Sequence, residues 1–229
     1  MKEALILAGG KGTRLRSVTN GSQKVAVRVG NQTFIELLLK QLETEGFSQV
    51  YLALGYRADD VRKVVSQLSL NLEIHFILER TPLGTGGAVK NAMKFISGNN
   101  VLVLNGDTYN EFHYSSIINT HEQTGAHVTV LVKSVDNVSR YGEVKIGAHK
   151  TIIKFTEKTG LKKPGVINSG VYVFNKNLLK DVSQESFSLE EFLTNHVNTL
   201  LMKAVYSDGR FFDIGTPEDY QQFIELFKD

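Results

Sequence analysis

Three glycines, two cations and a hydroxyl side chain directly follow the first apolar run of the chain, ALILA. Glycine has no Cβ atom and adopts positive φ, so backbone N–H groups in such a loop can approach a phosphate closely. Lysine supplies a mobile positive charge, and arginine supplies a planar fork of donors that can bind two phosphate oxygens. The segment therefore predicts an anion site formed by Gly9, Gly10, Lys11, Gly12, Thr13 and Arg14.

The known phosphate loops do not fit this segment. A Walker A loop requires Ser or Thr after its Gly-Lys pair, and Lys11 is followed by Gly12. A dinucleotide fingerprint that starts at Gly10 requires a third glycine where Leu15 stands. The segment is therefore a different anion loop, and a tight strand-to-helix turn with solvated charges remains the alternative.

Two aspartates mark further strand ends. Asp107 follows the buried run NVLVLN and one glycine, and Asp213 ends an aromatic run just before a glycine and a helix start. Ligands bind at the carboxyl ends of strands in open α/β sheets, and Mg²⁺ takes one or two carboxylates beside water and substrate phosphate. Each aspartate alone also fits a turn or a helix cap. Together with the anion loop, the pair predicts a divalent cation site.

The elements that position these residues follow from the hydrophobic pattern. In the first half, short apolar runs alternate with amphipathic stretches, which is typical of a parallel sheet with helices on both faces. Strands are expected at 4–8, 50–54, 72–78 and 100–105, and helices at 33–46, 58–68 and 86–95. The second half is richer in strands, expected at 126–133, 141–146, 151–157 and 168–174, with helices at 115–125 and 217–227.

Composition limits the class of protein. The 229 residues are 41% hydrophobic, which suffices for a sizeable core, and no linker or repeat interrupts them, so we expect one domain over 1–229. The formal charge of +2 predicts no nucleic acid partner. The chain has no cysteine, no signal-peptide pattern and no apolar stretch near the ~20 residues of a membrane span. We therefore expect a cytoplasmic protein without a membrane partner.

The order of the motifs resembles the sugar-phosphate nucleotidylyltransferases. That order is LAGGKGTRL at 7–15, LGTGGA at 83–88, NGD at 105–107, RYG at 140–142, EK at 157–158, NSGVY at 168–172 and DIGTPEDY at 213–220. Within the family, the chain looks most like the short guanylyltransferases that act on D-glycero-α-D-manno-heptose 1-phosphate. The resemblance implies a Rossmann-like α/β fold with a β-rich sugar-binding part. It also implies the reaction of GTP with a sugar 1-phosphate to give a GDP-sugar and pyrophosphate, for cell-surface polysaccharide biosynthesis.

The resemblance implies a role for each matching position. It places the nucleotide on Leu7, Ala8, Gly9, Gly10, Lys11, Gly12, Thr13 and Arg14, with its base and ribose near Glu79, Gly84 and Thr85, and Mg²⁺ on Asp107 and Asp213. It places the sugar 1-phosphate on Gly142, Glu157, Lys158, Asn168 and Gly170, with Lys158 steering the attacking oxygen. Arg14, Lys24, Asp107, Lys158 and Asp213 are the catalytic candidates. A homodimer is left open.

One segment departs from the family pattern. Relatives usually carry Lys-Pro-Met or Lys-Pro-Leu after the glycine loop, whereas here Val25 and Ala26 follow Lys24. Proline fixes φ and biases the preceding residue toward extended geometry, so without it the pose of Lys24 is not determined by the sequence. Lys24 remains the residue expected to reach the α-phosphate.

Three interpretations stay open at this stage. The first is a guanylyltransferase that makes GDP-heptose, and the second is the same reaction with mannose 1-phosphate, or with another hexose 1-phosphate and UTP, dTTP or CTP. The third is a non-catalytic nucleotide-sugar-binding regulatory subunit, which the altered lysine segment suggests. Retention of Arg14, Asp107 and Asp213 favours the enzyme, because a binding protein needs no pair of metal carboxylates.

Overall fold

A computed structural model of the chain describes residues 2–12, 15, 22–156, 158 and 160–226. Contacts divide the chain into two compact units. Unit 1 consists of Met1–Pro82, Leu104–Tyr109 and Phe212–Asp229, and unit 2 of Leu83–Val103 and Asn110–Phe211. We expected a single domain over 1–229, and the division into two compact units does not test that prediction.

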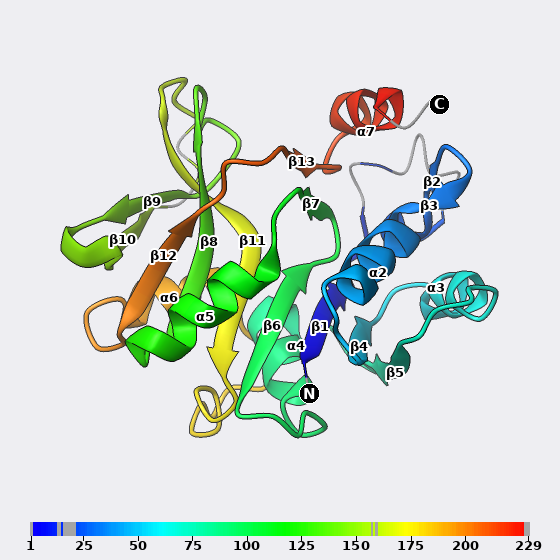
Figure 1. Cartoon of the computed structure of the whole chain (residues 1–229), viewed down its shortest axis with the longest axis horizontal. Helices are drawn as coiled ribbons and strands as arrows, with labels where there is room; N and C mark the ends of the chain where they lie inside the picture. The colour runs from blue at the N-terminus through cyan, green and yellow to red at the C-terminus, as the bar shows by residue number, and fades with distance from the viewer. Residues whose placement is uncertain (1, 13–14, 16–21, 157, 159, 227–229) are drawn as a thin grey trace. The chain divides into compact units, whose positions relative to one another are not determined.

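Unit 1 is built on the parallel strands β1 (Glu3–Ala8), β4 (Gln49–Leu54) and β5 (Glu73–Leu78). Every residue of β1 except Leu7 is buried, as expected for a strand covered on both faces. In the sheet, β1 is also hydrogen bonded to β6 (Asn100–Asn105), and the last two residues of β6 belong to this unit. The apolar runs thus form the parallel strands that the sequence predicts (Figure 1).

Two helices of unit 1 connect these strands. Helix α2 (Phe34–Thr44) begins at a Thr33–Glu36 pair in which the Glu36 side chain accepts from the Thr33 backbone N–H, and its apolar face is buried. Helix α3 (Ala58–Val65) carries Asp59 and Asp60 in its first turn, where acidic side chains interact favourably with the helix dipole. Both helices contact the short 3-10 helix η2 (Lys24–Ala26).

Unit 2 contains a sheet of mixed direction. Strand β11 (Gly165–Asn175) pairs antiparallel with β8 (Val128–Val135) and β9 (Glu143–Ile146), β9 pairs with β10 (Ile152–Thr156), and β12 (Met202–Tyr206) runs parallel to β8. In Figure 1, helix α5 (Tyr114–Thr124) covers one face, and α4 (Gly84–Ala92) and α6 (Leu189–His196) cover the other. A short 3-10 helix, η3, spans Ala148–Lys150.

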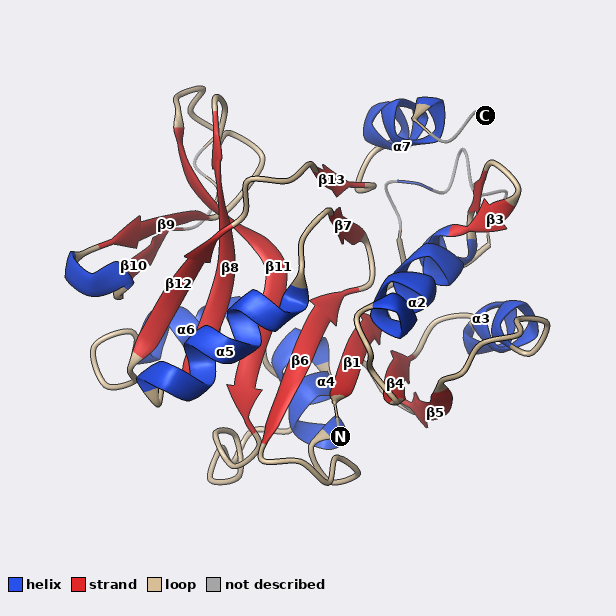
Figure 2. Cartoon of the chain, in the orientation of Figure 1, coloured by secondary structure: helices blue, strands red, loops and turns tan. Residues whose placement is uncertain are grey.

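Short strands complete the fold (Figure 2). Strands β2 (Arg28–Val29) and β3 (Gln32–Thr33) form one two-stranded sheet, and β7 (Thr108–Asn110) and β13 (Phe211–Asp213) form another. Helix α7 (Pro217–Glu225) follows β13 and packs Phe223 against Phe34, Tyr109 and Phe212.

The α/β class and the β-rich second half are confirmed. Helix α4 begins at Gly84, two residues before the expected start, and β11 extends beyond the predicted run at both ends. Helix α6 and strand β12 were not predicted. Both are short, with eight residues in α6 and five in β12.

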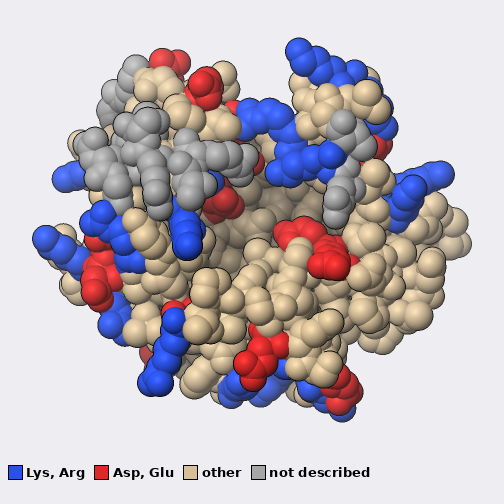
Figure 3. Space-filling model, turned by 180° about the vertical axis from the view of Figure 1, so that it is seen from behind, with Lys and Arg blue, Asp and Glu red and all other residues tan. Residues whose placement is uncertain are grey.

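The surface carries both signs of charge. Figure 3 shows Lys and Arg interspersed with Asp and Glu on the face that it draws, as the near-neutral composition predicts. None of the described helices combines the length and apolar character that crossing a membrane requires.

Candidate active site

The described part of the glycine loop, Gly9 to Gly12, directly follows β1 in unit 1. Gly10 and Lys11 are exposed, and a Cβ atom added to Gly10 would meet nothing within 4 Å. Gly12 has a φ of 54°, and a Cβ atom there would lie 3.0 Å from the Cβ atom of Lys24. The loop thus presents open backbone at Gly10 and touches Lys24 at Gly12. Thr13 and Arg14 lie outside the described residues.

The ends of three parallel strands meet at Gly9. Glu79 directly follows β5, and its Oε1 atom would lie 2.9 Å from a Cβ atom at Gly9. Gly55 follows β4, where a Cβ atom would lie 2.9 Å from the carbonyl oxygen of Gly9. The same oxygen accepts a hydrogen bond of 3.2 Å from the Tyr56 backbone N–H. The Glu79 carboxylate therefore lies beside the glycine loop, and its role toward a nucleotide base stays a prediction.

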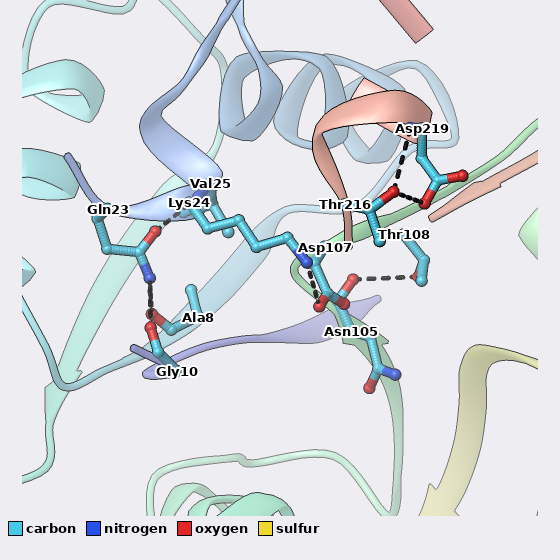
Figure 4. Close-up of polar contacts among 10 residues, drawn as sticks. All are labelled: Ala8, Gly10, Gln23, Lys24, Val25, Asn105, Asp107, Thr108, Thr216 and Asp219. Carbon is cyan, nitrogen blue, oxygen red and sulfur yellow. Dashed lines mark hydrogen bonds and ion pairs between the residues drawn. The ribbon is translucent and has the colours of Figure 1, made fainter. Parts of the chain in front are cut away.

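Lys24 reaches from η2 to Asp107. Its Nζ atom lies 2.8 Å from Oδ2 of Asp107 (Figure 4). The lysine side chain is only 9% exposed, while that of Asp107 is 41% exposed. The structure thus brings together two catalytic candidates that are 83 residues apart in the chain.

Gly106 allows Asp107 to lie close to β1. The N–H of Gly106 donates to the carbonyl oxygen of Leu7 over 2.9 Å. A Cβ atom at Gly106 would lie 2.6 Å from that same oxygen, which is closer than real Cβ atoms approach. Glycine is therefore required at the centre of the NGD motif by close approach of two backbones.

Asp213 is the last residue of β13, so its predicted position at a strand end is confirmed in the short sheet with β7. The backbone N–H of Ile214 donates to the carbonyl oxygen of Asp107 over 3.0 Å, which joins the two aspartate segments. Helix α7 begins directly afterwards, with Thr216 capping the N–H of Asp219. Burial raises the pKa of Tyr220 on this helix above its ordinary value, and its hydroxyl donates to the Arg28 carbonyl oxygen.

The residue that the sequence analysis missed is Gln23. Its side chain is almost fully buried. It hydrogen bonds to the backbone of Ala8 and Gly10, at the start of the glycine loop, and to the backbone of Val25, directly after Lys24 (Figure 4). The one signal in the sequence is a polar residue directly before Lys24. A lone glutamine carries no periodic pattern that would predict its burial.

Gly84 and Thr85 lie in unit 2, where the segment before α6 packs against them. Cβ atoms at Gly84 and Gly86 would lie 2.5 Å from the carbonyl oxygen and 2.2 Å from a ring carbon of Phe187. The Thr85 hydroxyl accepts from the N–H of Leu189 and thereby caps the start of α6. The close approach expected here is therefore made by the segment before α6, and a role of Gly84 and Thr85 toward a nucleotide stays a prediction.

Three of the residues predicted for the sugar 1-phosphate come together in unit 2. The N–H of Asn168 donates to the Gly142 carbonyl oxygen over 3.4 Å, and its Oδ1 atom accepts from the N–H of Gly170 over 3.0 Å. Gly170 has a φ of 77°, and the register of β11 shifts between Asn168 and Tyr172. Lys158 is exposed, and Glu157 lies outside the described residues.

The donor set of unit 1 suits a hard divalent cation. Asp107 and Asp213 offer carboxylates from segments that hydrogen bond to each other, and the Asp107 side chain is open to solvent. Within the described residues there is no group of three or more His, Cys, Asp or Glu side chains that could hold a metal alone. Magnesium sites of this kind use one or two carboxylates and complete their shell with substrate phosphate and water. Asp107 and Asp213 are therefore of the residue type that such an ion accepts, and their role as metal ligands stays a prediction.

Comparison with known proteins identifies the family of the chain. The family described as "Nucleotidyl transferase" matches residues 3–228. The D-glycero-α-D-manno-heptose 1-phosphate guanylyltransferases of Campylobacter jejuni and Aneurinibacillus thermoaerophilus are each 35% identical to the chain. The alignments cover 97% of this chain and 98% of the first, and 96% of this chain and of the second. The crystal structure of HddC from Yersinia pseudotuberculosis complexed with GMP-PN is 37% identical, with a TM-score of 0.89 and full coverage of both chains.

Proposed function

Because the chain belongs to the nucleotidyl transferase family, we propose that it transfers a guanylyl group from GTP to D-glycero-α-D-manno-heptose 1-phosphate. The products are GDP-heptose and pyrophosphate. One observation of the structure carries the proposal: Lys24 contacts the glycine loop at Gly12 and holds Asp107 at 2.8 Å. Lys24, the glycine loop and Asp107 thus lie together in unit 1, which supports the proposal. The substrates follow from the two enzymes of that activity that align over nearly their whole length.

The reaction needs little covalent chemistry from the protein. An oxygen of the sugar phosphate is already a nucleophile and attacks the α-phosphorus of GTP in line, while the bond to the β-phosphate breaks and pyrophosphate leaves. Positioning and charge neutralisation then account for most of the rate. We assign Lys24 to the α-phosphate, and Lys11 and Arg14 to the leaving pyrophosphate. The exposed Lys11 and the open space at Gly10 support this assignment.

We assign Mg²⁺ to Asp107 and Asp213. When bound, the ion neutralises charge on the transferring phosphoryl group. The partly exposed Asp107 carboxylate supports the assignment, since an open side leaves room for a ligand beside Lys24. The Asp107 carboxylate would then lie between two cations, the Mg²⁺ ion and the ammonium group of the buried Lys24 side chain.

We assign Glu79 to the guanine base. Its carboxylate lies beside Gly9, at the start of the loop that we assign to the nucleotide. A carboxylate accepts hydrogen bonds from the N1–H and the 2-amino group of guanine, whereas adenine offers no matching pair of donors. The position of Glu79 in unit 1 supports this choice, while Gly84 and Thr85 face the segment before α6.

We assign the sugar 1-phosphate to Gly142, Glu157, Lys158, Asn168 and Gly170 of unit 2. Asn168 and Gly170 lie where the register of β11 shifts, and the Asn168 side chain accepts from the Gly170 N–H, which supports a fixed arrangement of their polar groups. The exposed Lys158 can bind a phosphate oxygen. One extra hydroxymethyl group separates heptose from mannose, and a pocket discriminates at that scale by only ~1–3 kcal/mol. Some use of mannose 1-phosphate is therefore expected.

The test is pyrophosphate release from a panel of nucleoside triphosphates and sugar 1-phosphates, with each product identified by mass spectrometry. We expect GTP with heptose 1-phosphate to give the highest kcat/KM, and activity to require added Mg²⁺. A preference for UTP, dTTP or CTP would change the assigned base, and a preference for mannose 1-phosphate would change the sugar. No nucleotide sugar from any pair, with folded protein, would leave the regulatory subunit as the interpretation.

A further inference from the structure

The side chain of Gln23 joins two segments of unit 1. Its Nε2 atom donates to the carbonyl oxygens of Ala8 and Gly10, over 2.7 and 3.4 Å, and its Oε1 atom accepts from the Val25 N–H over 2.6 Å. Its backbone N–H donates to Oδ2 of Asp60 over 3.0 Å. The residue is 2% exposed, so these bonds form away from competing water.

These bonds fix the backbone on both sides of Lys24. Gln23 is the N-cap of η2, Lys24 is its first residue, and Val25 is bonded to the cap side chain. From this position, the stem of Lys24 contacts Gly12, and its Nζ atom pairs with Asp107. The pose of the lysine therefore depends on the side-chain hydrogen bonds of Gln23 to Ala8, Gly10 and Val25, which we call the clasp.

The clasp uses a donor that proline would remove. Val25 directly follows Lys24, and its N–H is the group that Gln23 Oε1 binds. A proline ring limits the backbone covalently and has no N–H to satisfy. Here a buried amide does the same through hydrogen bonds, and both of its polar atoms are paired.

We propose that Gln23 is a positioning residue that holds Lys24 in register with the glycine loop. It touches no substrate and acts through Lys24. The catalytic consequence of this inference rests on the proposed nucleotidyl transfer, but the position of Lys24 is measurable without any activity. A purely structural role for Gln23 would lower the stability of the fold without a specific effect on Lys24.

The first test measures the accessibility of Lys24 in the whole protein. Acetic anhydride labels free amines, and peptide mass spectrometry gives the rate at each lysine. In Gln23→Met, which cannot hydrogen bond, we expect Lys24 to be labelled at least five times faster than in wild type, while the half-exposed Lys40 keeps its rate. Thr129→Val is the matched control, because it deletes a buried hydrogen bond, 2.9 Å to His121, in unit 2. An unchanged rate at Lys24 in folded Gln23→Met overturns the inference, whatever the activity.

The second test is a double-mutant cycle on pyrophosphate release with the substrates that wild type uses best. We expect Gln23→Met to lower kcat at least tenfold with a smaller change in KM, and Lys24→Met to lower it further. In the Lys24→Met background, Gln23→Met should then have less than a threefold effect, because its target is gone. Equal losses in both backgrounds would overturn the inference. A wild-type protein that turns over no substrate pair would instead contradict the proposed function and leave the labelling test as the decisive one.

Discussion

Lys24 and Asp107 form an asymmetric ion pair. Their Nζ and Oδ2 atoms are 2.8 Å apart, but the lysine side chain is 9% exposed and the aspartate side chain 41% exposed. The lysine is held by the protein along its stem, whereas the carboxylate is open on one side. The pair can therefore keep its cation fixed while the aspartate accepts a further positive ligand.

Removal of the Asp107 charge should abolish most of the activity. Asp107→Asn removes the negative charge from a proposed metal ligand that also pairs with Lys24, so we expect kcat to fall at least 100-fold, or about 2.7 kcal/mol of barrier. Asp59→Asn is the control, since that carboxylate is 96% exposed and lies 3.9 Å from Arg62. Pyrophosphate release at saturating Mg²⁺ measures both. A loss of less than tenfold for Asp107→Asn would contradict its assignment.

Asp213 gives a separate prediction about the metal. Asp213→Asn removes one charged ligand and leaves Asp107, so we expect the Mg²⁺ concentration for half-maximal rate to rise at least tenfold. The measurement is a Mg²⁺ titration of pyrophosphate release for wild type and variant at fixed substrates. The same half-maximal concentration in both proteins would exclude Asp213 from the metal site.

The sequence predicts the frame of this site better than its side-chain contacts. The hydrophobic pattern predicts the apolar runs that become β1, β4 and β5, and the rule that ligands lie at the carboxyl ends of strands points to the glycine loop after β1. Glu79 was named from the family resemblance alone. The Lys24 pose was not predictable, because it depends on bonds of Gln23 to carbonyl groups 13 and 15 residues away. Such contacts leave no periodic pattern in the sequence.

Glycines show the same limit. The LGTGGA segment predicts a close approach, and the structure has one at Gly84 and Gly86, but the approaching group is Phe187 of the same chain. That partner precedes α6, a helix that the hydrophobic pattern did not indicate. A glycine therefore predicts that something comes close without saying what it is.

Glu79 should determine the choice of base. In Glu79→Gln, one acceptor of the guanine N1–H and 2-amino groups becomes a donor, so we expect kcat/KM for GTP to fall at least tenfold. Inosine triphosphate lacks the 2-amino group and is the matched probe: its disadvantage against GTP should shrink in the variant. An unchanged ratio of the two nucleotides would place Glu79 away from the base. Glu36→Gln, at the start of α2, controls for loss of a carboxylate elsewhere in unit 1.

Gly10 and Gly106 should respond differently to the same change. A Cβ atom at Gly10 meets nothing within 4 Å, so Gly10→Ala should leave stability unchanged and raise KM for the nucleotide alone, if a phosphate approaches there. Gly106→Ala would place its Cβ atom 2.6 Å from the Leu7 carbonyl oxygen, which forces the backbone to shift and should cost about 1–3 kcal/mol. Urea unfolding and steady-state kinetics distinguish the two. A nucleotide KM for Gly10→Ala equal to that of wild type would argue against a phosphate at this loop.

Burial of His121 should make the fold sensitive to acid. This residue is 2% exposed, its Nδ1 atom lies 2.9 Å from the Thr129 hydroxyl, and desolvation, with a smaller contribution from His127, lowers its pKa from 6.5 to about 4. Between these two values the unfolded chain binds a proton that the folded chain excludes. The free energy of unfolding therefore falls as the pH falls from about 6.5 toward 4, and is retained above that window.

The measurement is urea unfolding of wild type and His121→Gln at pH 7 and pH 4.5. Glutamine does not titrate, so we expect any stability advantage of wild type at pH 7 to shrink by about 2 kcal/mol at pH 4.5. Carboxylates that also protonate in this range affect both proteins equally and cancel in the difference. His75→Gln, at a partly exposed histidine beside Glu73, is measured in parallel as the control for loss of a histidine elsewhere in the fold. A difference between wild type and His121→Gln that stays constant over this range would show that His121 titrates alike in the folded and unfolded chain.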